Sequence, residues 1–224
     1  MKIAIILFPG FNRYTEIKKC LEQYSSPRID YIWHQETQDL NYDLIIIPGG
    51  FSYGDEEGAG TIAARSPIIN SIAHSAKRGV MLLGICNGFQ ILTKAKLLPG
   101  QLQENVTKRF ICKKLEIEIT NNNTRFTQHY RAHQKISLPI AHANGRYSAT
   151  DNEIKSLVEN NQIIMRYSAT NNVNGSTAAI AGIINKAGNI CGIMPHPENY
   201  FLPHQGGTDG LAFFTSIIGK TTWS

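Results

Sequence analysis

The chain has 224 residues, of which 42% are hydrophobic and 17% are charged, and these proportions are typical of a globular protein and not of a disordered one. The length is enough for one sizeable core, so we expect a single domain over residues 1–224. The net charge of +5 comes from short, dispersed basic blocks, which argues against a nucleic-acid partner. No apolar stretch is as long as a membrane span, so we expect a cytoplasmic protein without a membrane partner.

The first half of the chain alternates predicted strands and helices. An apolar run at residues 2–8 ends at Pro9-Gly10, which is typical of a strand and not of a signal segment. Further apolar runs predict strands at residues 29–33, 44–47 and 80–85. Helices are expected at residues 14–24 and 67–77, with Thr15 and Ser66 as their N-caps. This alternation predicts an α/β fold with a doubly wound, mostly parallel sheet flanked by helices.

The second half shows a different pattern. Apolar and charged residues alternate over residues 111–119, which is typical of a strand with one buried face. Apolar runs at residues 180–184 and 190–194 flank a glycine-containing turn, which predicts an antiparallel hairpin. A last helix is expected at about residues 209–218. We therefore expect an antiparallel hairpin region beside the parallel sheet.

Cys86 is the strongest candidate for a catalytic residue. It lies between a predicted strand and a predicted helix, in the segment Gly84-Ile85-Cys86-Asn87-Gly88. A nucleophile elbow has this pattern, because small neighbours permit the sharp turn that exposes the side chain above the sheet edge. The helix N-terminus also favours a thiolate. The alternative is a buried cysteine that serves as a small hydrophobic residue, but the place on the turn favours the nucleophile.

A cysteine nucleophile needs a base, and the base needs an orienting group. His196 and Glu198 are the candidates, in the segment Met194-Pro195-His196-Pro197-Glu198. The two prolines restrict the backbone around the histidine. The carboxylate two residues later is close enough to hold the imidazole in one tautomer.

Acyl transfer also needs hydrogen-bond donors for the developing oxyanion. Gly50, which ends the segment Pro48-Gly49-Gly50 after a predicted strand, is expected to supply one. The backbone N–H of Asn87, directly after the candidate nucleophile, is expected to supply another. For the two glycines alone, an ordinary turn is the alternative.

The remaining cysteines and the histidines do not indicate a metal centre. The four cysteines show no C-x-x-C pair and the seven histidines are scattered, so we expect no metal site. Cys20, Cys112 and Cys191 are expected to be reduced packing residues. For His142 two alternatives stay open: a structural role, or a place in the lining of the site or of a partner interface.

Three segments together resemble the class I, triad-type glutamine amidotransferases: Gly84-Ile85-Cys86-Asn87-Gly88-Phe89-Gln90, Pro48-Gly49-Gly50-Phe51-Ser52-Tyr53-Gly54-Asp55 and His196-Pro197-Glu198. Within this class, the second segment and the Asn-Gly-Phe-Gln form of the elbow resemble the glutaminase subunits of phosphoribosylformylglycinamidine synthases. The resemblance runs from Met1 to about Ile218, and the length is similar to that of the stand-alone small subunits.

The resemblance implies that Cys86, His196 and Glu198 hydrolyse L-glutamine, and that Gln90 helps to position this substrate. It implies that the ammonia passes to a large, ATP-dependent synthetase subunit, with a small bridging subunit in the same complex. It also implies that this chain holds no cofactor, because ATP and magnesium would be bound by the synthetase subunit.

The sequence departs from the family pattern at two places. After Gly54-Asp55 the family usually has an aromatic residue, a leucine and an arginine, where this chain has Glu56-Glu57-Gly58. After His-Pro-Glu the family usually has an arginine, where this chain has Asn199. Both changes remove positive charge, and the first adds two negative charges. We expect basic residues of the synthetase to face Glu56 and Glu57.

Three other functions stay open. The chain could be the amidotransferase subunit of another synthetase, against which the segment from Phe51 to Asp55 argues. It could be a flavodoxin-like cysteine hydrolase without an ammonia channel, although such proteins usually lack a late His-Pro-Glu segment. It could also be a non-catalytic interaction subunit with the same fold, against which the intact triad argues.

Overall fold

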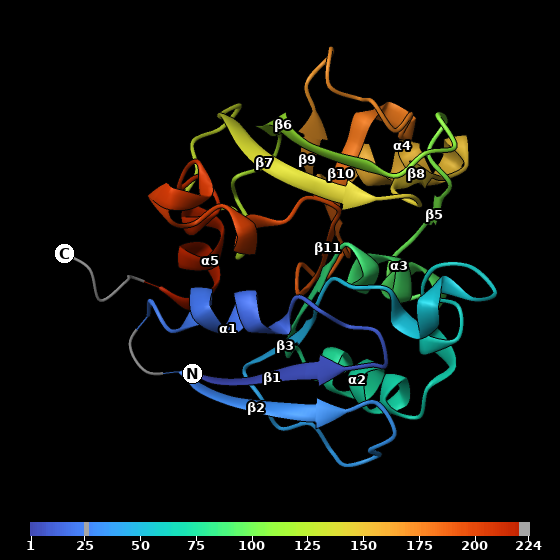
Figure 1. Ribbon diagram of the computed structural model, residues 1–224, viewed down its shortest axis with the longest axis vertical. Coiled ribbons are helices and arrows are strands. Elements are labelled where there is room, and N and C mark those ends of the chain that lie inside the picture. The colour runs from blue at the N-terminus through green and yellow to red at the C-terminus, as the bar shows by residue number, and fades with distance from the viewer. Residues whose placement is uncertain (25–26, 220–224) are drawn as a thin grey trace.

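The computed structural model describes residues 1–24 and 27–219. One nine-stranded sheet runs through the described part of the molecule, in the order β2-β1-β3-β4-β11-β10-β9-β6-β7. Adjacent strands from β2 to β11 are parallel, whereas those from β11 to β7 are antiparallel. Figure 1 shows the parallel part below and the antiparallel part above.

The parallel part has short, apolar strands. They are β1 (Lys2–Leu7), β2 (Arg28–Trp33), β3 (Leu44–Ile47), β4 (Met81–Ile85) and β11 (Ile190–Ile193). Every residue of β3, β4 and β11 is buried, because these central strands have neighbours on both edges and cover on both faces. Their carboxyl ends meet at one edge of the sheet, where ligands of such folds bind.

The antiparallel part consists of β10 (Ile180–Ile184), β9 (Ile163–Tyr167), β6 (Ile111–Ile119) and β7 (Lys135–His142). The predicted hairpin is confirmed, since β10 and β11 pair antiparallel with Ile184 opposite Cys191. The antiparallel part is larger than this one hairpin, because β9, β6 and β7 extend it. Two short strands, β5 (Gln101–Gln103) and β8 (Arg146–Ser148), form a separate small sheet.

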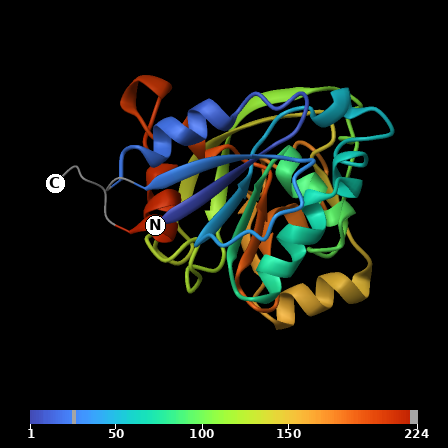
Figure 2. The same ribbon diagram turned by 90° about the horizontal axis from the view of Figure 1, so that it is seen from below.

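Helices cover both faces of the parallel part. Figure 2 shows α1 on one face and α2 and α3 on the other, so the doubly wound α/β fold class is confirmed. The α-helices are α1 (Tyr14–Leu21), α2 (Ile68–Lys77), α3 (Asn87–Lys94), α4 (Asp151–Glu159) and α5 (Leu211–Ile218). None of the helices within the described ranges has the length and apolar character that a membrane span requires.

Two predicted helix caps are wrong. Thr15 lies inside α1, and its Oγ1 donates to Oε2 of Glu16 at 2.8 Å. The N-cap of α2 is Pro67, and the hydroxyl of Ser66 lies 3.0 Å from Nδ1 of His34. Each hydroxyl therefore binds a neighbouring side chain and leaves the orphan helix N–H groups to other acceptors.

Candidate active site

Cys86 lies on the sharp turn between β4 and α3. It is the N-cap residue of α3, with φ 51° and ψ −103°, a conformation that is strained for any residue except glycine. Its backbone N–H donates to the carbonyl of Ile193 at 2.7 Å, which ties the turn to the end of β11. Cys86 is only 5% exposed, so the fold presents its thiol to a confined space.

The glycines of the elbow allow α3 to pack directly on the sheet backbone. A Cβ atom on Gly88 would lie 2.0 Å from the carbonyl oxygen of Ile47 in β3. A Cβ atom on Gly84 would lie 2.6 Å from Leu92 and 2.7 Å from the carbonyl oxygen of Gly88. Only glycine fits such close approaches, so these two residues fix the position of the helix N-terminus beneath Cys86.

His196 and Glu198 follow β11 and form a buried pair. Nδ1 of His196 lies 2.6 Å from Oε1 of Glu198, with side-chain exposures of 3% and 0%. Because a carboxylate only accepts, Nδ1–H donates and Nε2 is left for another partner. The backbone N–H of His196 donates to the carbonyl of Pro139 in β7 at 2.8 Å, so the antiparallel part of the sheet holds this loop in place.

The charges around His196 favour its protonated form. Burial lowers the pKa of its imidazole, but the negative charges of Glu198 and Cys86 outweigh burial and raise the pKa to about 10. A protonated imidazole next to a cysteine stabilises the thiolate. This arrangement can perform nucleophilic attack by sulfur followed by proton transfer from the imidazolium.

Two adjoining cavities meet at Cys86, and both are also lined by Gly50, Phe51 and Ala141. The first, which we call the His196 cavity, has a volume of about 140 Å³ and is further lined by His196, Arg13, Phe110 and Cys112. The second, the Gln90 cavity, has a volume of only about 10 Å³ and is further lined by Gln90, Asp55, His142 and Asn144. A larger cavity of about 350 Å³ lies around Lys96 and Thr150, but neither Cys86 nor His196 lines it.

The expected oxyanion donors lie beside Cys86. Gly50 forms an antiparallel bridge with Phe11 and lines both cavities. Asn87 is the first residue of α3, where a backbone N–H has no acceptor within the helix. Its side chain is fully buried, and Oδ1 accepts the backbone N–H of Ser52 at 2.9 Å. The Asn87 side chain therefore connects the nucleophile turn to the loop that follows Gly50.

Gln90 also acts as a bridge between segments. Its Oε1 accepts from Nδ2 of Asn87 at 2.6 Å, and its Nε2 donates to the carbonyl of Asn144 at 2.7 Å. These bonds connect α3 to the turn between β7 and β8. Gln90 therefore lines the Gln90 cavity while its Oε1 and its Nε2 each already make one hydrogen bond.

His142 lies in the lining of the Gln90 cavity. Nδ2 of Asn105 donates to the carbonyls of Arg109 and His142, so Oδ1 of Asn105 must accept from Nδ1 of His142 at 3.2 Å. Burial, together with the positive charge of His196, lowers the pKa of His142 to about 4. His142 is therefore neutral near pH 7, and its Nε2 is an acceptor without a partner among the described residues.

The other cysteines behave differently from one another. Cys20 and Cys191 are buried, and burial raises the pKa of each thiol. The prediction that Cys112 is a packing residue is wrong, because it is exposed and lines the His196 cavity. It lies opposite Ala141 in the β6–β7 pairing, and the carbonyl oxygen of Ala141 is 3.7 Å from Sγ of Cys86. Within the described part of the chain, no His, Cys, Asp and Glu side chains cluster as metal ligands would.

The chain is similar to known proteins along most of its length. Residues 1–208 match the model of a CobB/CobQ-like glutamine amidotransferase domain. The chain is 47% identical over 218 residues to phosphoribosylformylglycinamidine synthase subunit PurQ of Bartonella henselae, a match covering 97% of this chain and 98% of that protein. A second relative, the same subunit of Brucella abortus, is 44% identical over 99% of this chain and its own full length.

Solved structures have the same fold. The structure of PurLQS from Thermotoga maritima matches with a TM-score of 0.87 and 40% identity, and the match covers 96% of both chains. A glutaminase domain of the CTPS of Trypanosoma brucei, solved with bound acivicin, matches with a TM-score of 0.65 over 100% of this chain and 96% of that chain. It is only 16% identical, so it supports the fold alone.

Proposed function

Because this chain belongs to the family with a CobB/CobQ-like glutamine amidotransferase domain, we propose that it is the glutaminase subunit of phosphoribosylformylglycinamidine synthase. The identity of 47% to a named subunit of that enzyme, over nearly the whole of both chains, supports this assignment. It favours this synthase over the other synthetases that such subunits serve. The single structural observation that carries the glutaminase chemistry is the buried His196–Glu198 pair beside the cysteine elbow.

In the proposed reaction, Sγ of Cys86 attacks the side-chain amide carbon of L-glutamine, and the carbonyl oxygen becomes an oxyanion. The backbone N–H groups of Gly50 and Asn87 stabilise this charge. The His196 imidazolium gives its proton to the leaving nitrogen, the C–N bond of the tetrahedral intermediate breaks, and ammonia departs and leaves a thioester on Cys86. Neutral His196 then takes a proton from water, which attacks the thioester and releases glutamate. Glu198 holds the imidazole in the required tautomer throughout.

The ammonia would pass to a large synthetase subunit that uses ATP and magnesium to convert formylglycinamide ribonucleotide to its amidine. A small bridging subunit completes the proposed complex, as the name PurLQS of the similar structure suggests. No cofactor is proposed for this chain, and the proposed location is the cytoplasm, where purine biosynthesis takes place.

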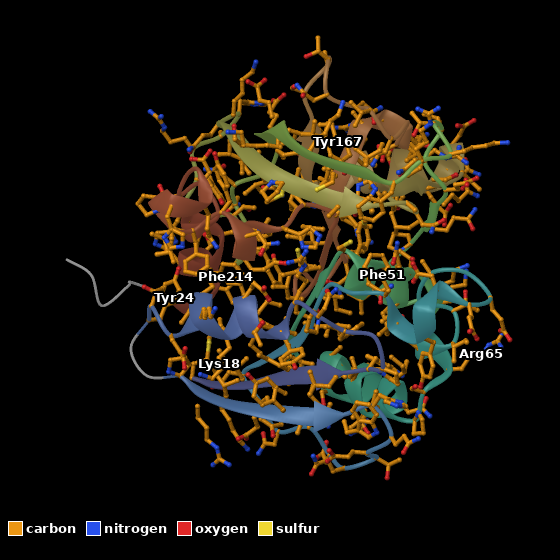
Figure 3. The ribbon with its side chains drawn as sticks, viewed as in Figure 1. Lys18, Tyr24, Phe51, Arg65, Tyr167 and Phe214 are labelled. Carbon is orange, nitrogen blue, oxygen red and sulfur yellow. The ribbon has the colours of Figure 1, made fainter. Side chains whose placement is uncertain are left out.

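The proposed docking face surrounds the mouth of the His196 cavity. Phe51 and Phe110 are 42% and 49% exposed, and their ring centroids are 6.2 Å apart. Figure 3 shows Phe51 beside α3, between the two parts of the sheet. Exposed aromatic residues are typical anchors of interfaces. Nearby, Glu57 forms an exposed ion pair with Arg65 at 3.2 Å, which offsets one of the two negative charges that depart from the family pattern.

The first test compares nitrogen sources. The chain is mixed with its cognate synthetase subunits, ATP and formylglycinamide ribonucleotide, and amidine formation is measured with glutamine or with free ammonia. Cys86→Ala should abolish the glutamine reaction and leave the ammonia reaction unchanged, because ammonia bypasses the nucleophile. Equal rates of the wild type with either nitrogen source at low concentration would contradict the assignment.

A second test concerns the docking charges. The double substitution Glu56→Gln/Glu57→Gln should weaken the complex at low salt, where exposed charges interact most strongly. Lys155→Gln, on the exposed face of α4, is a control for a change of charge elsewhere. Unchanged affinity of the double variant at low salt would contradict the proposed contact.

A further inference from the structure

We propose that the carboxylate of Asp55 binds the α-ammonium group of the glutamine substrate and so makes the site selective for an amide that is also an α-amino acid. This inference rests on the proposed glutaminase function and adds a specificity-determining residue to it. Asp55 is the last residue of the tight turn η1 (Ser52–Asp55), and it lines the Gln90 cavity together with Cys86. The reacting thiol and this carboxylate therefore border one space, whose volume of about 10 Å³ suits a group of about the size of a water molecule, such as an ammonium group, while the adjoining His196 cavity of about 140 Å³ is left for the rest of the substrate.

The first observation is an unpaired carboxylate oxygen. Oδ1 of Asp55 is inaccessible to solvent, and it has no hydrogen-bond partner among the described residues. A buried carboxylate oxygen without a donor is costly. Burial also raises the pKa of Asp55, because the surroundings supply no compensating positive charge. A ligand that brings a positive charge and N–H donors would remove this cost.

The second observation is the chemistry of the cavity wall. Among its nine lining residues, Asp55 carries the only carboxylate, and there is no lysine or arginine. His142 is neutral there, with an acceptor at Nε2. The side-chain atoms that lack partners on this wall are thus acceptors, and they fit a cation with several N–H donors better than an anion. The α-ammonium group is the cationic part of glutamine.

The third observation is the backbone at this place. Tyr53, Gly54 and Asp55 have φ values of 54°, 66° and 58°, so three successive residues adopt the left-handed region, which is unfavourable for a bulky residue such as Tyr53 and is tolerated better by glycine, aspartate and asparagine. The backbone N–H of Tyr53 donates to the carbonyl of Pro9 at 2.9 Å, and Asn87 accepts from Ser52. These contacts hold the segment in a conformation that brings Asp55 to the cavity.

The test uses two substrates that differ only in the amino group. L-Glutamine and glutaramate, which lacks the α-amino group, are compared as nitrogen donors in the complete complex. Asp55→Asn suits the backbone, because asparagine tolerates the left-handed region well. We expect Asp55→Asn to raise KM for glutamine roughly 10- to 100-fold, the usual effect of losing a charge-assisted hydrogen bond. The kcat/KM for glutaramate should stay within about twofold of the wild type, as expected when no contact is lost.

Asp39→Asn is the matched control, since Asp39 is an exposed carboxylate that pairs with Arg78. It should leave the selectivity between the two substrates unchanged. If Asp55→Asn lowers kcat/KM equally for both substrates, Asp55 has a structural role and the inference is overturned. Unchanged KM for glutamine overturns it as well.

Two further measurements distinguish a failure of the proposed glutaminase function from a failure of the role proposed for Asp55. If wild-type complex releases no glutamate and Cys86 is not labelled by 6-diazo-5-oxo-L-norleucine, the proposed function fails and the inference with it. If the wild type passes both tests and Asp55→Asn is labelled as fast as the wild type at low reagent concentration, only the inference fails. Iodoacetamide, which has no α-amino group, should label Cys86 in both proteins at similar rates.

Discussion

Nδ1 of His196 lies 2.6 Å from Oε1 of Glu198 in a buried environment, and the two residues are separated by a single proline. The pair needs no long-range folding event to form, because the chain places both side chains on the same short turn after β11. The rest of the fold positions this pair beside Cys86. The carbonyl of Pro139 holds the backbone of His196, and Gly49 packs on its ring, with a Cβ there meeting Cε1 at 2.9 Å.

Glu198→Gln should impair the glutamine reaction without impairing the ammonia reaction. The amide can no longer hold the imidazolium by charge, and it can present a donor to Nδ1, which would favour the wrong tautomer. We expect kcat with glutamine to fall by about 10²- to 10⁴-fold. Steady-state rates with both nitrogen sources, together with a circular dichroism spectrum, provide the measurement. An equal loss with ammonia would show that the substitution damages the complex and not the triad.

The free energy of unfolding should depend on pH because of the same His196–Glu198 pair. The pKa of His196 in the folded chain is about 10, above its ordinary value of about 6.5 in an unfolded chain. Protonated His196 therefore stabilises the folded chain. This contribution to the free energy of unfolding is fully present below about pH 6.5 and is lost as the pH rises through about 10. Each pKa unit corresponds to about 1.4 kcal/mol, so the wild type should lose a few kcal/mol over this interval.

Urea unfolding at several pH values would measure this loss. In Glu198→Gln the main cause of the raised pKa is absent, so the free energy of unfolding should change less over the same interval. If the free energy of unfolding changes equally with pH in the two proteins, the assigned charge state of His196 is contradicted.

The parallel half of the fold could be predicted from the sequence because its signals are local. Each central strand is an uninterrupted apolar run that ends in a glycine or proline turn, and the elbow is readable within five residues. The strand β7 has a weaker signal, since Pro139 interrupts its pattern. Proline is tolerated there because β7 is the last strand of the sheet. By contrast, α4 has a complete capping box from Thr150 and Glu153, a signal that the sequence contains and from which this helix could have been predicted.

The candidate site also has a part that could be predicted from the sequence and a part that could not. Cys86, His196 and Glu198 stand in short segments with recognisable chemistry, and the fold brings these segments together. The bonds from Gln90 to Asn144 and from His142 to Asn105 join residues 54 and 37 positions apart. No local pattern encodes such pairs, because they depend on where the antiparallel strands place the loop after β7. The exposed position of Cys112 depends on the same strands.

Thiol labelling should separate the four cysteines into two classes. Iodoacetamide should modify Cys112, which is exposed, and Cys86, which borders both cavities. Cys20 and Cys191 should react only after unfolding, because they are buried and burial raises the pKa of their thiols. Mass spectrometry of the native and the urea-unfolded chain would count and locate the adducts. Rapid modification of Cys191 in the native chain would contradict the packing of β11.

Asn87→Ala should loosen the loop after Gly50. The substitution removes the acceptor of the buried Ser52 N–H and the donor to Gln90, and a buried N–H without a partner costs about 1–3 kcal/mol. We expect lower stability and a lower kcat with glutamine, because an oxyanion donor must be held in place. Asn160→Ala, at the exposed end of α4, is the control. A normal kcat of Asn87→Ala with glutamine would show that catalysis does not need this side chain.

Gly88→Ala should test whether the helix N-terminus is fixed by backbone contact. The added methyl group would lie 2.0 Å from the carbonyl oxygen of Ile47, so α3 must move away from β3. We expect a loss of about 1–3 kcal/mol or more in the free energy of unfolding, as in overpacked cores. The same shift displaces Cys86, so the glutamine reaction should be lost at temperatures where the chain is still folded.

Gly188→Ala is the matched control for this change. Gly188 lies in the turn between β10 and β11, where no atom lies within 4 Å of an added Cβ, although its φ is 75°. This backbone conformation alone should cost roughly 1 kcal/mol, and the glutamine reaction should be retained. If the two alanine variants lose equal stability and both keep the glutamine reaction, α3 does not depend on the contact with β3, and the elbow owes its geometry to the backbone of Cys86 alone.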